Sequence, residues 1–294
     1  MTGTPAKFVP QIERRRKLGR LFAVLCASLS LVGLVFLGVL MGQVLWEGAS
    51  WVSATFLTNF PSVLYPEKAG VKSALWGSIW LMVMTTLLAV PVGVASAVYL
   101  EEYAPRNRFT RFIHLNISNL AGVPSIVYGI LGLAVFVRWM NFNRSVLAGA
   151  LTLTLLILPV IIIASREALA AVPRSFRLAA YALGATRWQT VRSHVLPAAL
   201  PGIMTGIILA LSRAIGEAAP LIMIGAFTYV AFVPEGPMDA FTSLPIQIFA
   251  WSDQPQPEFH HLAAAGIIVL LGILLPMNAV AIAVRAWYQR KKAW

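Results

Sequence analysis

A pair of charged residues lies within one of the most apolar stretches of this 294-residue chain. Arg213 and Glu217 are four residues apart, which places both side chains on one face of a helix, close enough to neutralise each other. A charge deep in a membrane costs about 2.5–3.5 kcal/mol on insertion scales, so it normally faces the protein interior or a water-filled path. Because a guanidinium stays charged and its fork matches phosphate-like oxyanions, the pair predicts a position that handles or gates an anion. The alternative is a structural ion pair that joins two spans.

Helix-breaking residues flank this pair and also interrupt another apolar stretch. Gly216 and Pro220 lie beside the pair, so we expect the helix to bend or loosen there. The segment Gly-Val-Pro-Ser at 122–125 predicts a second break, with Pro124 and Ser125 at a kink that lines a pathway. Tight helix packing by small residues is the alternative interpretation of this segment.

Residues 166–197 form a basic segment between two strongly apolar stretches. Small residues over 178–183 predict a short helix, and Gly184 and further basic residues follow it. The short apolar face of such a helix can bind in a groove of another protein while its arginines stay in solvent. The arginines expected in solvent are Arg174, Arg177, Arg187 and Arg192. An ordinary positively charged cytoplasmic loop is the alternative.

The sequence carries no pattern typical of an enzyme. It has no GxxxxGK[ST] phosphate loop, so we do not expect it to bind and hydrolyse ATP through that motif. His260 and His261 are adjacent and point in different directions on a helix, and no cysteine joins them, so we predict no metal site. The serines and aspartates form no recognisable nucleophile constellation. We therefore expect no catalytic residue and no cofactor.

The elements that position these residues are membrane spans. The chain is 59% hydrophobic and only 12% charged, which excludes an ordinary soluble domain. Its net charge of +12 does not come from a basic patch with interleaved aromatics, so we predict no nucleic-acid binding. Six apolar segments are each long enough to cross about 30 Å of hydrocarbon as a helix. They cover 21–45, 73–100, 112–137, 145–165, from after Pro197 to about Val230, and 262–284. The predicted fold class is an all-α polytopic membrane protein with six transmembrane helices.

Basic residues predict the orientation of these spans, because Lys and Arg near span ends are retained on the cytoplasmic side. Eighteen of the 23 lie in the two tails, in the loop after the second span and in the loop after the fourth. Only four lie on the other side, and Arg213 is within a span. We therefore expect both termini in the cytoplasm. The expected organisation is a basic tail at 1–20, a first span at 21–45, an outer loop at 46–72, a core domain at 73–285 that includes the cytoplasmic loop 166–196, and a basic tail at 286–294.

The second long outer loop, residues 231–261, is acidic and rich in proline. It carries four carboxylates, no lysine or arginine, and five prolines. A rigid acidic loop of this kind can receive an external partner. A solvated loop that proline keeps irregular is the alternative.

The basic segment at 166–197 resembles a cytoplasmic loop of a known protein family. Ala179-Ala180, then Gly184, then Leu196-Pro197 resemble the cytoplasmic "EAA" loop of ABC importer permeases. Leu178 stands where the family often has Glu, and His194 stands where it often has Ile. The resemblance implies that this loop contacts an ATPase subunit. The residues that it implies for the contact are Ala179, Ala180, Tyr181, Leu183, Gly184, Ala185 and Arg187.

Three further segments are similar to the permeases of phosphate ABC importers, over most of residues 70–285. They are AGVPSIVYG at 121–129, GEAAPL at 216–221 and SLPIQIF at 243–249. The resemblance implies a type I importer of the MetI-like fold in the bacterial inner membrane. It implies a second permease subunit, two ATPase copies below, a phosphate-binding protein above, and a coupling helix at 178–190 that the ATPase pushes. Inorganic phosphate would then pass Arg213.

Three other functions stay open from the residues. The first is an ABC permease for another substrate, such as sulfate, molybdate or an amino acid. The second is an ion-driven secondary transporter, which predicts more intramembrane carboxylates than Glu217 alone. The third is a membrane-anchored scaffold, which would not need Arg213 or spans broken by proline.

Overall fold

The computed structural model of this chain describes residues 12–226 and 229–291, which form helices, turns and one isolated β-bridge between Ser145 and Ala240. Lys7 of the predicted N-terminal tail, Lys292 of the C-terminal tail and residues 227–228 of the fifth apolar segment lie outside these ranges. In chain order the elements are α1 (Ile12–Gly48), η1 (Ala49–Trp51), α2 (Ala54–Thr58), η2 (Pro66–Lys68), α3 (Lys72–Val98), η3 (Tyr99–Tyr103), α4 (Arg108–Ala121), α5 (Ser125–Gly132), η4 (Leu133–Trp139), α6 (Val146–Ala170), α7 (Arg174–Ala182), α8 (Arg187–Thr190), η5 (Val191–Val195), α9 (Leu196–Ile215), α10 (Ala219–Met223), α11 (Leu244–Ser252) and α12 (Pro257–Lys291).

Within the described ranges, five continuous helices are long and apolar enough to cross a membrane. They are α1, α3 with η3, α6, the run from α8 through α9, and α12. A sixth span is made of two parts, because α4 and the run of α5 with η4 meet at an angle of 102°. Counted in this way, the predicted all-α fold with six spans is confirmed.

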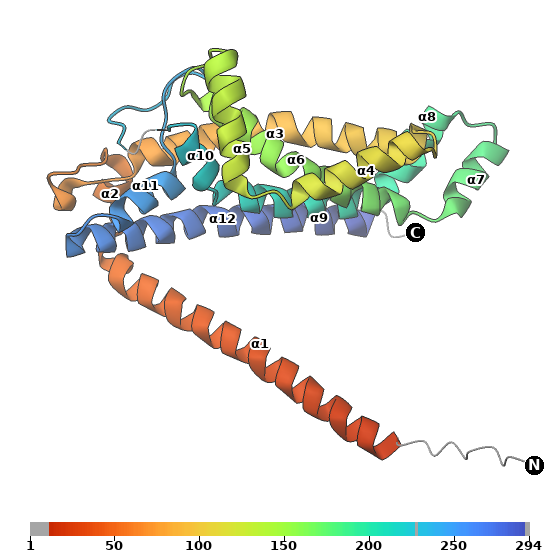
Figure 1. Cartoon of the computed structure of the whole chain (residues 1–294), viewed down its shortest axis with the longest axis horizontal. Helices are drawn as coiled ribbons and strands as arrows, with labels where there is room; N and C mark the ends of the chain where they lie inside the picture. The colour runs from red at the N-terminus through yellow and green to blue at the C-terminus, as the bar shows by residue number, and fades with distance from the viewer. Residues whose placement is uncertain (1–11, 227–228, 292–294) are drawn as a thin grey trace, which may run out of the picture.

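Helix α6 is the centre of the body and packs between α3 and α9 (Figure 1). Its side chains Leu153, Ile157 and Ile161 are almost fully buried, and their spacing of four residues stacks them on one face. They share a core with Leu81 of α3 and Ala210 of α9. A helix that is buried on most of its surface can be apolar all round, as this one is.

Small residues set the close approach of α9 to α6. A side chain added at Gly206 would lie 2.4 Å from the Cβ of Ala164, and one added at Gly202 would lie 2.7 Å from the Cβ of Ala168. Gly202 and Gly206 are four residues apart, so they form one smooth strip along α9. Small residues at such a seam let two helix backbones approach closely in a membrane, where dispersion contacts drive association.

The third and the fifth predicted spans differ from the structure in their boundaries. The fifth span begins at Arg187, ten residues before Pro197, and α9 ends at Ile215 instead of near residue 230. A π-helical turn, η5, precedes Pro197, and this irregular turn accommodates a residue that lacks a backbone N–H donor. The third span starts earlier than predicted, at Arg108, because Asn107 caps α4 by accepting a hydrogen bond from the backbone N–H of Thr110 at 2.8 Å.

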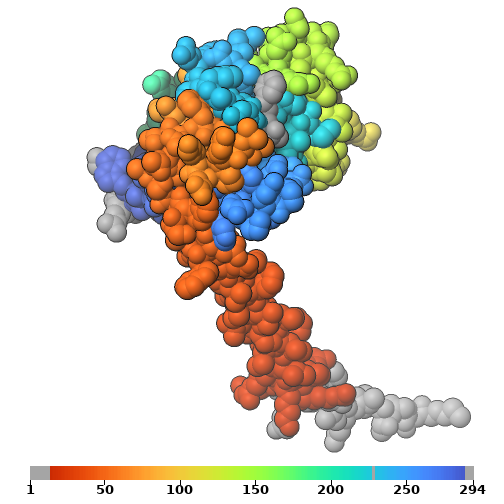
Figure 2. Space-filling model, turned by 90° about the vertical axis from the view of Figure 1, so that its left-hand side faces the viewer, coloured from red at the N-terminus to blue at the C-terminus, as the bar shows by residue number. Residues whose placement is uncertain are grey.

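Helix α1 leaves the body at an angle, and only its C-terminal end packs on α12 (Figures 1 and 2). Gly48 makes this contact possible, because an added Cβ there would lie 2.6 Å from the backbone of Ala264. No part of the apolar window of α1 is buried within the described chain. Trp46, predicted in the outer loop, lies instead in the last turn of α1 and is 89% exposed.

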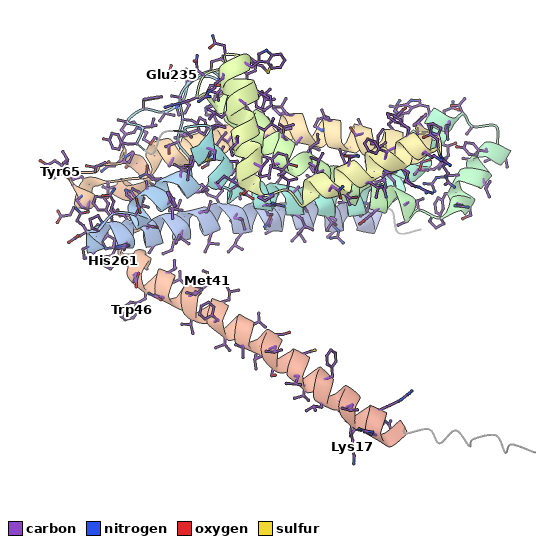
Figure 3. All side chains as sticks on the ribbon, viewed as in Figure 1. Lys17, Met41, Trp46, Tyr65, Glu235 and His261 are labelled. Carbon is purple, nitrogen blue, oxygen red and sulfur yellow. The ribbon has the colours of Figure 1, made fainter. Side chains whose placement is uncertain are left out.

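The two ends of the body differ in character. Trp46, Tyr65, Glu235 and His261 lie at one end, which we call the aromatic end (Figure 3). Helices α7 and α8 lie at the opposite end of the body, and the C-terminal part of α12 runs toward them (Figure 1). Lys17 lies on the part of α1 that has left the body, on the same side of the view as α7 (Figure 3). We call the end with α7 and α8 the basic end, since it gathers the segments in which the sequence concentrates lysine and arginine.

Candidate functional site

The predicted ion pair forms at the end of α9. The Nε of Arg213 donates a hydrogen bond to an oxygen of Glu217 at 3.2 Å. Arg213 lies in the last turn of α9, and Glu217 lies just beyond the helix, because Gly216 caps it. A cation in the last turn is favourable for the helix dipole. The pairing and the interruption that Gly216 and Pro220 predicted are therefore both present, and α10 resumes the chain at Ala219.

The second predicted break, at residues 122–125, also forms. Helix α4 ends at Ala121, Pro124 precedes α5, and Ser125 is its first residue. The Tyr128 hydroxyl donates a hydrogen bond to the carbonyl oxygen of Leu120 at 2.9 Å. The same carbonyl accepts from the backbone N–H of Val123 at 3.0 Å, so the Tyr128 bond ties α5 to the last turn of α4 across the bend.

The two breaks lie together in the fold although about 90 residues separate them in the sequence. Helix α5 packs directly on α10. A side chain added at Gly129 of α5 would lie 2.7 Å from both the Cα of Pro220 and the Cβ of Met223. The predicted pathway residues on α5, α9 and α10 therefore belong to one region of the protein.

We expect Gly129→Val to destabilise this region, because the new side chain would clash with the backbone of Pro220. Overpacking of this kind typically costs about 1–3 kcal/mol. Thermal unfolding of the detergent-solubilised protein measures the effect. Gly122→Ala is the matched control, since its added Cβ would meet its nearest atom, the carbonyl oxygen of Asn119, at an ordinary 3.5 Å. Equal unfolding temperatures for the two variants would contradict the packing described here.

The members of the ion pair face different surroundings. The Arg213 side chain is 43% exposed, whereas that of Glu217 is 17% exposed. Glu217 borders a narrow space beside Ser78 and Ser243 of only about 10 Å³, barely enough for one water molecule. An oxyanion does not fit there. It can approach the pair only from the outer face of the chain, where the Arg213 guanidinium lies.

The basic segment forms two short helices joined by a sharp turn. Gly184 has φ of +80°, and the backbone N–H groups of Gly184 and Ala185 donate to the carbonyls of Tyr181 and Ala180 at 3.0 and 3.1 Å. This pair of bonds is a Schellman motif, which ends α7 at Ala182. Thr186 then starts α8 through a capping box with Gln189. The short helix predicted over 178–183 forms as the C-terminal part of α7. The coupling helix that the family resemblance implied over 178–190 is not continuous, since the turn at Gly184 interrupts it.

The predicted contact residues cluster around this turn. Ala179, Tyr181, Leu183 and Gly184 are exposed, whereas Ala180 is 5% exposed and faces the body. Large apolar side chains make the exposed surface of α7 and α8, and Leu183 is 89% exposed. They are Phe176, Leu178, Tyr181, Leu183 and Trp188, which we call the apolar tip. An exposed apolar patch of this kind is typical of a protein-binding surface.

Three of the four arginines expected in solvent are exposed, and one is not. Arg174, Arg187 and Arg192 are exposed, and Arg187 lies over the Tyr103 ring at 5.2 Å from its centroid. The prediction is wrong for Arg177, whose side chain is only 17% exposed and is paired with Glu102. The sequence analysis did not single out Glu102. Its signal was the Glu101-Glu102 doublet at the end of the second span, in a chain with only 11 acidic residues.

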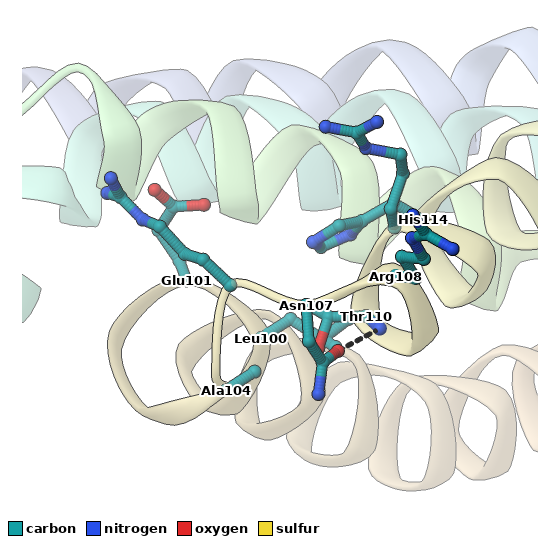
Figure 4. A pocket seen from close by; sticks show the side chains of 9 residues that line it. Leu100, Glu101, Ala104, Asn107, Arg108, Thr110 and His114 are labelled. Carbon is teal, nitrogen blue, oxygen red and sulfur yellow. Dashed lines mark hydrogen bonds between the residues drawn. The ribbon is translucent and has the colours of Figure 1, made fainter.

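Beside this pair, the start of α4 borders a recess of about 540 Å³ at the basic end (Figure 4). Its lining carries Glu101, Arg106, Arg108, Arg111 and His114. On its far side the His114 ring nitrogen Nδ1 lies 2.7 Å from Arg166, which is 3.6 Å from Glu101. Partly buried contacts of charged and polar side chains thus connect η3, α4 and α6 at this end.

The acidic loop is held against the body at the aromatic end. The Asp239 carboxylate accepts hydrogen bonds from the backbone N–H groups of Glu235 and Gly236, both at 2.8 Å. The carbonyls of Asp239 and Pro237 in turn accept from the first N–H groups of α6, at Val146 and Leu147. The loop therefore caps the central helix. The adjacent segment 243–249 forms α11, whose Gln247 is 3% exposed.

The predicted pathway residues and the predicted ATPase-contact residues lie far apart, near opposite ends of one long helical run. Arg213 is 26 residues beyond Arg187 in one continuous run, roughly 39 Å at 1.5 Å per residue. The ion pair with the two breaks is one site, and the α7–α8 turn is another. The long helix is the physical connection between them.

With this geometry described, the chain can be compared with known proteins. The family described as "Binding-protein-dependent transport system inner membrane component" matches residues 89–293. The chain is 32% identical to the Bacillus subtilis protein named "Probable ABC transporter permease protein YqgI", over 87% of this chain and 90% of that protein. It is also 32% identical to "Phosphate transport system permease protein PstA" of Yersinia pestis, over 95% of this chain and 92% of that one.

Solved structures share the fold at low sequence identity. A chain of a bacterial alginate ABC transporter, solved in complex with an alginate pentasaccharide-bound periplasmic protein, matches 93% of this chain and 96% of its own length, with a TM-score of 0.65 and 15% identity. A chain of the inward-facing MetNI methionine ABC transporter matches 73% of this chain and 94% of its own length, with a TM-score of 0.62 and 18% identity. The predicted MetI-like type I importer fold is therefore confirmed.

Proposed function

Because this chain belongs to the family of binding-protein-dependent transport system inner membrane components, we propose that it is the permease subunit that carries inorganic phosphate in an ATP-driven importer. The protein is a multi-pass component of the bacterial inner membrane. The similarity to PstA proteins over most of the chain supports phosphate as the substrate.

One structural observation carries the proposal: the Arg213–Glu217 pair lies on an outer face of the chain beside two helix breaks. A guanidinium at such a position offers N–H donors in a fork that matches phosphate oxygens. An arriving anion competes with Glu217 for Arg213. Since the enclosed space beside Glu217 is too small for phosphate, the route runs along this face and is completed by another subunit.

The importer contains the partners that such a route requires. A second, PstC-like permease covers the Arg213 face, a dimer of PstB-like ATPase subunits lies at the basic end, and a PstS-like phosphate-binding protein lies at the aromatic end. Family membership supports an ATPase and a substrate-binding protein as partners. Membrane lipid surrounds the remaining apolar surface.

ATP drives the transport step through the α7–α8 turn. The apolar tip, which includes the predicted contact residues Tyr181 and Leu183, binds the ATPase. The predicted residues Ala179, Gly184, Ala185 and Arg187 add to this contact, whereas Ala180 packs toward the body. Closure of the ATPase dimer pushes α7 and switches the spans between inward-facing and outward-facing states. The exposure of the apolar tip supports this role, as does the single continuous helix from α8 to the ion pair.

The basic end faces the cytoplasm in this proposal, with both termini inside. The excess of lysine and arginine in the segments at this end supports the orientation. So does the aromatic end, where exposed Trp46 and Tyr65 suit the opposite membrane–water interface.

Reconstitution tests the proposed function. The chain is purified with its second permease and ATPase and placed in proteoliposomes, and phosphate-loaded binding protein is added on the outer side. We expect ATP hydrolysis that this protein stimulates and uptake of labelled phosphate that stops without ATP. The matched control replaces phosphate by sulfate. Phosphate uptake without any ATPase subunit, or uptake of sulfate in preference to phosphate, would contradict the proposal.

A further inference from the structure

We propose that Arg177 is a positioning residue that couples α7 to the spans: its guanidinium and the Glu102 carboxylate transmit the movement of α7 to α3 and α6. This inference rests on the proposed function, because it concerns how movement of the α7–α8 turn reaches the membrane. It adds a residue pair to which neither the sequence resemblance nor the family assigns a role.

All three nitrogens of the Arg177 guanidinium donate hydrogen bonds to groups outside α7. Its Nε donates to both carboxylate oxygens of Glu102, at 3.1 and 3.3 Å, and its Nη2 donates to one of them. Glu102 belongs to η3, the π-helical continuation of α3. Nη1 and Nη2 also donate to the carbonyls of Val172 and Leu169, at 2.8 and 3.0 Å. Leu169 is in the last turn of α6 and Val172 lies just beyond its end, so these two bonds attach the guanidinium to the C-terminal end of α6.

Burial distinguishes this pair from the other charged contacts of the basic end. The Glu102 side chain is 6% exposed and that of Arg177 is 17% exposed, whereas those of Arg166 and Glu101 are 31% and 26% exposed. The hydrogen bond that Arg177 donates to Glu102 raises the pKa of Arg177, so the guanidinium stays charged. A buried, bidentate pair is geometrically specific, and removal of one partner leaves the other charge uncompensated.

An open recess lies between α7 and the body, so the contacts of Arg177 are an important connection between them. An open recess of about 920 Å³ separates much of α7 from the loop that follows η3. Arg177, Leu178 and Tyr181 line it on one side, and Glu102 and Tyr103 line it on the other. The Arg177 contacts cross this recess and join α7 to α3 and α6. These two helices pack extensively on each other, so a displacement passed to both of them reaches the body as a unit.

The position of Glu102 in a π-helical turn fits this role. A π-turn adds one residue to a helix and changes the direction of the side chains that follow, and such turns occur often at functional sites. In this chain the turn covers Tyr99–Tyr103 and leaves Glu102 buried beside α7. Its neighbour Glu101 pairs with Arg166 instead and also lines the α4 recess.

The test compares Arg177→Gln and Glu102→Gln in the complete reconstituted importer. Each substitution removes one charge and keeps a polar side chain. Glu102→Gln also keeps the side-chain shape, whereas Arg177→Gln shortens the side chain and removes the guanidinium. The readout is the amount of phosphate taken up per ATP hydrolysed, measured beside the yield of assembled complex. We expect the ATPase to stay bound and active while uptake per ATP falls roughly tenfold, within the range of about 5–150-fold that is typical of coupling between sites.

Two further variants define the control and the pairing. Arg174→Gln removes an exposed charge from the same helix and should leave uptake per ATP unchanged. The double variant Glu102→Gln with Arg177→Gln should be no worse than the more damaging single one, because the two residues act as one unit.

Two outcomes would overturn the inference. Normal uptake per ATP in both single variants would show that the pair does not couple α7 to the spans. Loss of assembled complex in both would show that it serves folding alone. If only Arg177→Gln assembles poorly, the uptake per ATP of Glu102→Gln decides. A decrease supports coupling of α7 to the spans, and a normal value overturns it. A wild-type importer that takes up no phosphate would instead contradict the proposed function, so the two failures are distinguishable.

Discussion

Replacing Arg213 by glutamine is expected to abolish phosphate uptake while the importer still assembles. Glutamine keeps a polar side chain in the last turn of α9 but removes the charge and the fork that an oxyanion would bind. We expect a decrease of roughly a hundredfold or more, on the scale of losing one charged or polar donor to an oxyanion in a site shielded from water. Uptake into proteoliposomes measures the effect, and copurification of the other subunits measures assembly.

The double variant Arg213→Gln with Glu217→Gln separates anion handling from a structural ion pair. If the pair only stabilises the break between α9 and α10, removing both charges should largely restore function, because neither charge is then left unpaired. If Arg213 handles the anion, the double variant should stay inactive. Recovery of uptake in the double variant would therefore reduce Arg213 to a structural role. Glu217→Gln alone, which keeps the guanidinium, should retain part of the uptake.

The second large effect is expected at the turn between α7 and α8. Gly184→Arg places a long charged side chain beside the exposed Leu183, and an added Cβ at this position meets no atom of the chain itself. It also puts a residue with a Cβ at φ of +80°, which costs roughly 1–2 kcal/mol. We expect binding of the ATPase to weaken by roughly thirtyfold or more, the scale of about 2 kcal/mol for an interface hot spot. Copurification of the ATPase with a tagged permease measures the loss, and membrane insertion should be unchanged.

Gly184→Asn is the matched control for this experiment. Asparagine tolerates positive φ better than other residues with a side chain, and it is much smaller than arginine. It should keep the Schellman motif and retain most of the ATPase. Normal ATPase binding by Gly184→Arg would refute the docking role of the turn. Equal losses in both variants would assign the effect to the backbone.

The features that were predictable from sequence are local ones. The i, i+4 spacing of Arg213 and Glu217 was sufficient to predict the pair, and Pro124 after Gly122 was sufficient to predict a break. Apolar length gave the number of spans, because a hydrocarbon layer demands about 20 apolar residues regardless of how helices pack. The packing of α5 on α10 was not predictable, since no pattern within either segment specifies its neighbour.

The incorrect predictions have identifiable causes. Arg177 was treated like every other arginine near a span end, and its partner Glu102 is 75 residues away in the chain. The continuous coupling helix that the family resemblance implied over 178–190 conflicts with two local signals, Gly184 at the C′ position of α7 and the Thr186–Gln189 capping box. These signals lie in the sequence itself. The arrangement of Arg177 required knowledge of tertiary structure.

The seam between α6 and α9 limits how this molecule can change shape. Gly202 and Gly206 meet Ala168 and Ala164 so closely that a slide or roll of one helix past the other would drive backbone into side chain. The two helices must therefore travel as one rigid body. Whatever flexing a transport cycle requires falls on the discontinuities at Gly122–Pro124 and Gly216–Pro220, which makes these short, easily overlooked joints the hinges of the protein.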